Sequence, residues 1–143
     1  MSDSGRITFH FQDTPFRLRQ RHAVRAWLLA IAQQHGQTIG ELNYLFCSDD
    51  HMLEVNGRHL DHHYYTDILT FPMPSAHGIS GDILISIDRV RDNARHHEQR
   101  PTDELHRVMA HGLLHLLGLD DTTPELQRAM RKAEDHCLSS RNF

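Results

Sequence analysis

The sequence predicts an α+β fold, in which a mixed sheet of about four strands packs against helices. Strand-like patterns occur in four segments that all end by residue 87, whereas helical patterns dominate the chain after that point. Strands concentrated early and helices concentrated late are typical of α+β domains. With 143 residues the chain has the length of one domain, so we expect a single domain over residues 1–143.

The composition describes an ordinary globular protein, with 38% hydrophobic and 24% charged residues. No apolar run approaches the ~20 residues that span a membrane, and the N-terminus lacks the pattern of a signal peptide. We therefore expect a cytoplasmic monomer with two free thiols, Cys47 and Cys137. The net charge of −4 argues against strong non-specific binding of nucleic acids. The positive charge is almost all arginine, however, and arginine suits local phosphate contacts.

The four predicted strands alternate apolar and polar residues or form short apolar runs. They cover residues 7–12, 42–47, 66–71 and 81–87. In the first strand Ile7, Phe9 and Phe11 alternate with polar residues, and in the third the pattern stops before Pro72. We therefore expect the third strand to end at this proline.

A first helix is predicted over roughly residues 15–35, opened by Pro15 and ended by Gly36. Four arginines, at positions 17, 19, 21 and 25, gather near its start. They form either a solvated face or an RNA-contacting patch.

A second, short helix is expected to begin at Asp49 or Asp50 and to run through Val55. The polar, histidine-rich residues 56–65 that follow are interpreted as a loop. This loop either faces a substrate or is plain surface.

Three helices are predicted after residue 87. The first covers residues 88–99, with Ser86 as its cap. The second begins at Pro101, and the third begins at Pro124 after the capping residue Thr123.

The most informative motif lies in the second of these helices. His111 and His115 stand four residues apart, so on a helix their imidazoles share one face and can bind one metal ion. Gly118 can adopt the left-handed conformation that ends a helix, which would bring Asp120 or Asp121 back towards the ion. Three protein ligands with an open fourth position are typical of catalytic zinc sites.

Three separated blocks, taken together, resemble a known family. They read Thr66-Asp67-Ile68-Leu69-Thr70-Phe71, Gly81-Asp82-Ile83-Leu84-Ile85-Ser86 and His111-Gly112-Leu113-Leu114-His115-Leu116-Leu117-Gly118. In order and spacing they are similar to the YbeY family of bacterial metal-dependent endoribonucleases. The resemblance implies a small α+β domain that holds one Zn²⁺ per chain near its surface. It also implies single-strand-type cleavage of ribosomal RNA in rRNA maturation and ribosome quality control, with ribosomal small-subunit proteins as possible partners.

The chain departs from the usual family pattern at two positions. Asp121 stands where the family has a third histidine, so the expected ligands are His111, His115 and Asp121. An anionic ligand would make the ion a weaker Lewis acid. The second departure is Asp61, which replaces a family arginine, and Arg58 is a nearby substitute for the stabilisation of phosphate charge.

Two aspartates in the family-like blocks have open roles. Asp67 either positions the substrate, or forms a hydrogen bond to a residue that itself binds the metal or the substrate, or makes a purely structural contact at a strand end or turn. Asp82 is interpreted as structural. Together with Arg58, Asp67 completes the catalytic residues that we expect, and the general base is not identifiable from sequence.

Two other functions compete with RNA cleavage. The spacing from His115 to Asp121 is similar to that of metzincin peptidases, but those enzymes place a catalytic glutamate where this chain has Gly112. Alternatively, Asp120 could be a fourth ligand that closes a structural metal site in a non-catalytic RNA- or ribosome-binding module. Two histidines and a carboxylate also suit nickel, iron or manganese.

Overall fold

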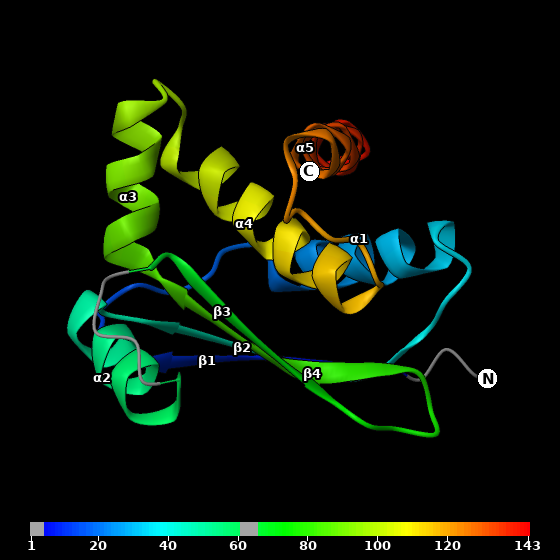
Figure 1. The fold of residues 1–143 in the computed structure, drawn as a ribbon, viewed down its shortest axis with the longest axis horizontal. Helices are drawn as coiled ribbons and strands as arrows, with labels where there is room; N and C mark the ends of the chain where they lie inside the picture. The colour runs from blue at the N-terminus through cyan, green and yellow to red at the C-terminus, as the bar shows by residue number, and fades with distance from the viewer. Residues whose placement is uncertain (1–4, 61–65) are drawn as a thin grey trace.

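The computed structural model describes residues 5–60 and 66–143, without the side chains of residues 58–60, and has the α+β architecture that the sequence predicts. Figure 1 shows the order of the elements. These are β1 (Arg6–Gln12), α1 (Arg21–Gln34), β2 (Ile39–Cys47), α2 (Asp49–Leu60), β3 (Ile68–Met73), β4 (Ile79–Ser86), α3 (Ile87–His96), α4 (Pro101–Leu116) and α5 (Pro124–Ser139). Among the described helices, none is long and apolar enough to cross a membrane.

The sheet is mixed, with strand order β1-β2-β4-β3. β1, β2 and β4 run parallel, and β3 pairs antiparallel with β4 at the edge. β3 continues through Pro72, which lies opposite Gly81, so the expectation that this strand ends at the proline is wrong. An edge strand tolerates proline because one side of its backbone has no partner strand.

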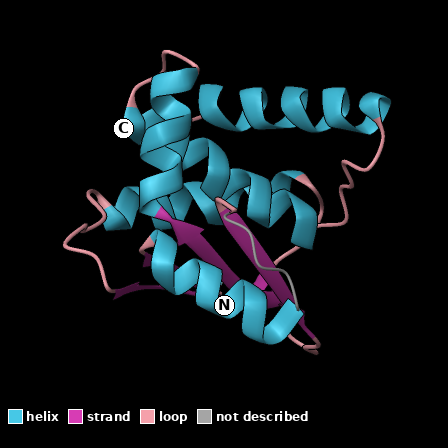
Figure 2. Cartoon of the chain, turned by 60° about the vertical axis from the view of Figure 1, so that its left-hand side comes forward, coloured by secondary structure: helices cyan, strands magenta, loops and turns pink. Residues whose placement is uncertain are grey.

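One face of the sheet carries the main core, under the helical layer that contains α1 and α4 (Figures 1 and 2). α4 is central to this layer. The Tyr44 hydroxyl of β2 donates to the carbonyl of Met109 at 2.8 Å, and the Trp27 indole of α1 donates to the carbonyl of Cys137 at 2.8 Å. Both bonds satisfy polar atoms that burial would otherwise leave unpaired. Cys47 and Cys137 are buried free thiols, as predicted.

Gly112 permits the close approach of α4 to the sheet. A Cβ atom at this position would lie 3.0 Å from side-chain carbons of Ile68 and Ile83. The helix therefore presents a glycine where it crosses the strands, directly after His111. This packing explains Gly112 without any catalytic role.

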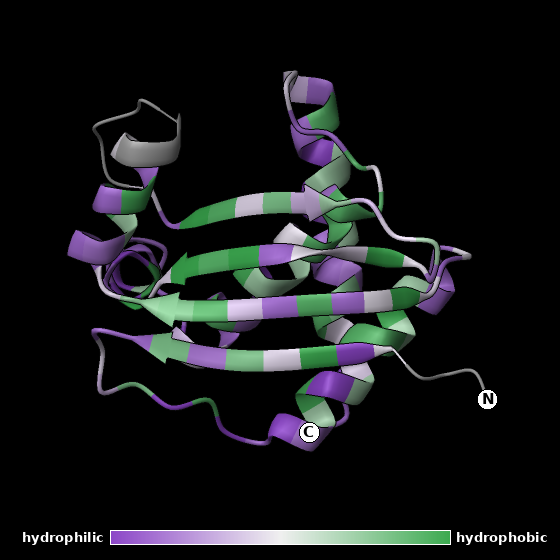
Figure 3. Ribbon diagram, turned by 90° about the horizontal axis from the view of Figure 1, so that it is seen from below, coloured by the Kyte–Doolittle hydropathy of each residue, from purple (hydrophilic) through white to green (hydrophobic). Residues whose placement is uncertain are grey.

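α2 lies on the opposite side of the sheet from the other helices, as Figure 2 shows. It covers a smaller cluster that includes Met52, Val55 and Leu84. Beside it the sheet face is open, with mixed polar and apolar residues (Figure 3). A row of side chains crosses this face: Thr8 donates to Asn43 at 2.6 Å, and Asn43 donates to Asp82 at 2.9 Å.

The predicted helix over residues 15–35 is wrong at its start, because α1 begins at Arg21. Gln20 has a φ of 56°, which interrupts a helix, and Phe16 instead packs edge-on against Phe46. The segment before Arg21 is therefore irregular, and its Phe16 side chain packs on the sheet. Three of the four arginines contact aromatic rings of β1: Arg17 and Arg21 lie over Phe11, and Arg25 lies over Phe9.

The predicted loop over residues 56–65 is wrong in its first half, because α2 continues to Leu60. Met52, Val55 and Asn56 are buried at helical spacing, and the polarity of Asn56 concealed this periodicity. Residues 61–65 lie outside the described residues. The predicted caps of α3 and α5 are confirmed: Ser86 accepts from the backbone N–H of Arg89, and Thr123 accepts from that of Leu126.

His106 makes stability depend on pH. It is 4% exposed, its ring packs against Trp27 and Phe143, and Arg141 donates to its Nδ1 at 2.7 Å. Burial, and then the charge of Arg141, lowers the pKa of His106 from 6.5 to about 4, although Asp103 opposes this shift. The unfolded chain thus binds a proton that the folded chain rejects between these two values.

We expect His106 to contribute about 3 kcal/mol of stability above pH 6.5 that is lost as the pH falls to about 4. Urea unfolding across this range measures the free energy of unfolding. His106→Gln should lack this part of the pH dependence. Parallel profiles for wild type and variant would contradict the assignment.

Candidate metal centre

The C-terminal end of α4 forms a turn that places a carboxylate beside two histidines. The N–H of Gly118 bonds to the carbonyl of His115, and the N–H of Leu119 bonds to that of Leu114. These bonds form a Schellman motif, which needs a positive φ at Gly118, and the observed φ is 108°. The chain then reverses along the helix end and brings Asp121 back over the histidines, as the sequence predicts.

The three predicted ligands converge. Within the described residues, His111, His115 and Asp121 offer ligand atoms that all lie within 4.8 Å of one another. These three residues are called the triad below. The Asp121 Oδ2 atom lies 3.6 Å from His111 Nε2 and 3.5 Å from His115 Nε2. Two imidazole nitrogens and a carboxylate oxygen form a donor set that zinc and other divalent transition metals accept.

Glu134 of α5 contacts the ring nitrogen of His111 that does not face Asp121. Its Oε2 atom lies 2.6 Å from His111 Nδ1, and its Oε1 atom accepts from Arg107 at 2.9 Å. Burial alone would lower the pKa of His111, but the hydrogen bond and charge of Glu134 outweigh it and raise this pKa. Burial alone would raise the pKa of Glu134, but His111 and Arg107 lower it. Glu134 is therefore an anion that favours positive charge at His111.

His115 is oriented by the turn itself. Its Nδ1 atom lies 3.0 Å from the backbone carbonyl oxygen of Leu119, which can only accept a hydrogen bond. Nδ1 of His115 therefore carries the proton, and Nε2 keeps a free lone pair. Since His111 is held in the same way by Glu134, both Nε2 atoms face Asp121. Such support of the other ring nitrogen is usual for metal-binding histidines.

Asp120 serves the turn and not the triad. Its Oδ1 atom accepts from the backbone N–H of Asp121 at 2.8 Å, and its Oδ2 atom accepts from the hydroxyl of Thr122 at 2.9 Å. Asp120 is also absent from the set of converging ligand atoms, so the structure gives it a role in the turn. Among the described residues the cluster has three members, which leaves a fourth position for water or substrate.

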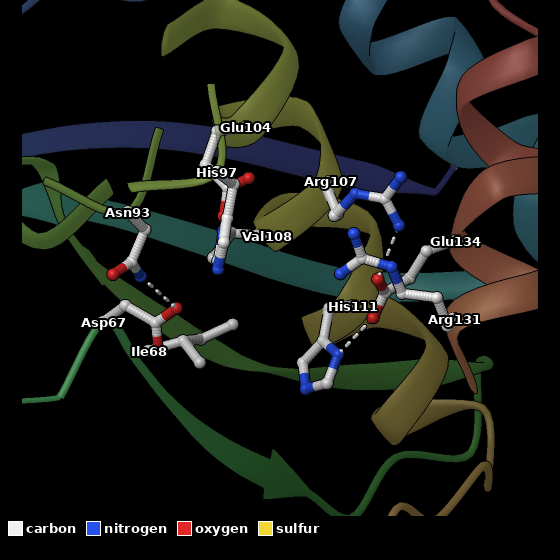
Figure 4. A pocket seen from close by; sticks show the side chains of 10 residues that line it. All are labelled: Asp67, Ile68, Asn93, His97, Glu104, Arg107, Val108, His111, Arg131 and Glu134. Atoms are coloured by element: carbon white, nitrogen blue, oxygen red, sulfur yellow. Dashed lines mark hydrogen bonds and ion pairs between the residues drawn. The ribbon is translucent and has the colours of Figure 1, made fainter. Parts of the chain in front are cut away.

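A cavity of about 270 Å³ adjoins the triad, and Figure 4 shows the side chains that line it. His111, Glu134 and Arg131 lie at one end, and Asn93, His97 and Glu104 lie towards the other.

Asp67 also lines this cavity, where Asn93 donates to its carboxylate at 3.4 Å. Burial raises the pKa of Asp67, although its own backbone N–H and the charge of His111 oppose the shift. The same cavity is therefore lined by His111 of the triad and by a second set of polar side chains, those of Asp67, Asn93, His97 and Glu104.

A family model described as endoribonuclease YbeY matches residues 7–142. The chain belongs to the endoribonuclease YbeY family. Two curated members are the endoribonuclease YbeY of Cytophaga hutchinsonii, 52% identical with 96% of each chain covered, and that of Bacteroides thetaiotaomicron, 44% identical with 94% of this chain and 98% of the relative covered. Membership places the chain among RNA-cleaving hydrolases.

A solved structure gives the same picture of the fold. The solution structure of a protein from Thermotoga maritima aligns with a TM-score of 0.60 at 23% identity, covering 92% of this chain and 89% of that one. At this identity the likeness supports the architecture alone.

The remaining predicted residues either lie apart from the triad or fall outside the residues that the structure describes. The backbone of Arg58 belongs to α2, but its side chain lies outside the described residues, as does Asp61. Asp82 contacts Asn43 on the sheet face opposite Ile83, whose side chain meets α4 at Gly112. The triad lies on the α4 side, so a structural role for Asp82 fits its position.

Sequence reasoning missed the groups that support the triad, above all Glu134 and Arg107. Glu134 lies in the apolar stripe of the last helix, four residues after Met130 and three before Cys137, and is 6% exposed. A carboxylate on a buried helical face needs a buried partner. The position of Glu134 in this stripe therefore indicates that it has a buried partner, but the pattern does not identify His111 and Arg107 as that partner.

Proposed function

We propose that this chain is a metal-dependent endoribonuclease that cleaves single-stranded segments of ribosomal RNA during rRNA maturation and ribosome quality control. The observation that carries the proposal is the convergence of His111, His115 and Asp121, with each histidine held at Nδ1 so that Nε2 is free. Membership of the endoribonuclease family supplies the substrate class. Presentation of the RNA by small-subunit ribosomal proteins belongs to the same proposal.

We assign one Zn²⁺ to the three residues of the triad. Nitrogen and carboxylate ligands with an open position are the usual composition of a catalytic zinc site. Such an ion, when bound, supplies a Lewis acid for the phosphate and lowers the pKa of water. Glu134 and Arg107 keep the His111 ring in place, and the turn after Gly118 keeps Asp121 in place.

Asp121 sets the charge of this site. An aspartate contributes a negative charge that the usual third histidine does not, so less positive charge remains at the phosphate. Arg58 is proposed to offset the charge of the RNA phosphate in place of the family arginine at position 61. Asp67 is proposed to position the substrate from the wall of the cavity.

The alternative of a closed structural site is disfavoured because Asp120, which bonds within the turn, does not join the three converging ligands among the described residues. A peptidase is disfavoured by Gly112, which packs on Ile68 and Ile83 and has no side chain to act as a base. The triad with an open position fits catalysis better than either.

The test is cleavage of purified ribosomal RNA by the wild type and by Asp121→His. We expect the wild type to cleave, a chelator to abolish cleavage, and added zinc to restore it. The variant should bind metal and cleave faster, because a neutral ligand leaves more positive charge for the phosphate. Cleavage that persists in chelator would refute metal dependence, and a slower variant that retains its metal would refute the role given to the Asp121 charge.

A further inference from the structure

The cavity beside the triad has two chemically different ends. At the triad end Arg131 makes no hydrogen bond or ion pair with a described residue, and its charge, which also acts on Glu104, can meet an anion in the cavity. At the far end the acidic side chains of Asp67 and Glu104 face the same space. Ile68 and Val108 line it between these ends (Figure 4). An elongated ligand with a phosphate and a neutral, hydrogen-bonding part matches this division.

Glu104 is the most informative residue of the cavity. It is 7% exposed, and its carboxylate makes no hydrogen bond with any described residue. The Glu104 side chain lines the cavity and its carboxylate has no donor among the described residues, so its oxygens are available to a ligand that brings N–H groups. Burial raises the pKa of both carboxyls, although the charges of His97, Arg107 and Arg131 oppose the shift at Glu104 and backbone N–H groups oppose it at Asp67.

The size and the walls of the cavity fit one flat ring. Its volume of about 270 Å³ lies just below the range of about 300–1,000 Å³ that is usual for drug-sized ligands. The carbon side chains of Ile68 and Val108 offer the apolar surface that a ring system needs. A phosphate at the far end would instead meet two carboxyl groups and be repelled.

The distance along α4 also suits one nucleotide. Glu104 and His111 are seven residues apart on this helix, a rise of about 10 Å at 1.5 Å per residue. A nucleotide can bridge that span, with its base at Glu104 and its phosphate near His111. Endoribonucleases meet such unpaired bases in single-stranded RNA, where the Watson–Crick edge is free for hydrogen bonds.

We propose that this cavity is a nucleobase subsite that selects guanine next to the cleaved phosphate, with Glu104 as the residue that reads the base. Guanine has two adjacent N–H donors on its Watson–Crick edge, from N1 and the 2-amino group, and a carboxylate can accept both in parallel. Adenine, cytosine and uracil lack this pair. This inference rests on the proposed nuclease function for its biological meaning.

Binding of free nucleosides tests the subsite apart from the metal and from cleavage. Guanosine, inosine and adenosine lack a phosphate, so metal–phosphate contacts do not contribute to the signal. NMR titration of the full chain with each nucleoside measures affinity and locates the site. We expect guanosine to shift signals of α4 and β3, inosine to bind about 10-fold more weakly because it lacks the 2-amino group, and adenosine not to bind there.

Two variants and a control complete the test. Glu104→Gln preserves shape but replaces one acceptor oxygen with a donor, so guanosine binding should fall about 10-fold or more while the melting temperature is retained. Asp67→Asn tests the second carboxyl with the same readout. Glu125→Gln, an exposed change on α5, should bind as the wild type does.

Equal binding of all nucleosides, or unchanged guanosine binding by Glu104→Gln, would overturn the proposal. Shifts caused by Mg²⁺ but not by guanosine would overturn it as well and assign the carboxyls to a cation. RNA cleavage without guanosine binding would refute the subsite and leave the nuclease intact. Guanosine binding without RNA cleavage would support the subsite and refute the proposed nuclease function.

Discussion

His111→Ala is expected to abolish metal binding and RNA cleavage together. The Nε2 atom of His111 is one of three converging ligand atoms, and removal of even an outer supporting group typically weakens metal affinity by about 10- to 100-fold. Loss of a ligand should therefore weaken affinity by more than about 100-fold. The fold should survive, because Glu134 keeps its ion pair with Arg107 when the imidazole is gone.

Three measurements on the same sample check this prediction: zinc affinity, cleavage of ribosomal RNA, and the melting temperature in chelator. The metal-free variant should melt within about 5 °C of the metal-free wild type. His22→Ala, an exposed histidine of α1, is the matched control and should retain both metal and activity. A variant that cleaves RNA normally, or that unfolds even when compared in chelator, would contradict a catalytic role for His111.

Glu134→Gln is expected to weaken zinc affinity by about 10- to 100-fold while every ligand stays in place. Glutamine can still accept a hydrogen bond from His111 Nδ1, so ring orientation is largely kept. What is lost is the negative charge, which lies 2.6 Å from the ring and favours a cation on its far side. Arg107 would then face an amide where it now faces a carboxylate.

Competition with a chromophoric chelator measures the dissociation constant for zinc in this variant. Asp135→Asn is the control, because Asp135 also accepts from Arg107, at 2.6 Å, yet makes no contact with the triad. The control should bind zinc as the wild type does. Equal affinities for Glu134→Gln and Asp135→Asn would show that Glu134 does not support the metal ligand.

The features that could be predicted from sequence are those fixed by local geometry. The spacing of His111 and His115 determines that they share a helix face, and Gly118 determines where that helix ends. The caps Ser86 and Thr123 were predictable for the same reason, since a cap acts on a backbone N–H only a few residues away. The sheet class followed from the order of strand and helix patterns along the chain.

The features that could not be predicted depend on residues far apart in sequence. Glu134 reaches His111 only because α5 packs on α4, and nothing in a helical period indicates that pairing. Gln20 breaks the first helix because Phe16 serves the sheet core, a tertiary requirement that overrides the pattern. Asn56 is polar yet buried, so its polarity suggested a loop where the helix continues.

The most direct test of the central claim is the metal content of the purified, untagged chain and of Asp121→Ala, measured by elemental analysis. The three-ligand site predicts one zinc ion per chain in the wild type and a strongly reduced content in the variant. Full zinc content in both proteins would remove Asp121 from the ligand set. A wild type that neither carries zinc nor takes it up would contradict the metal centre itself.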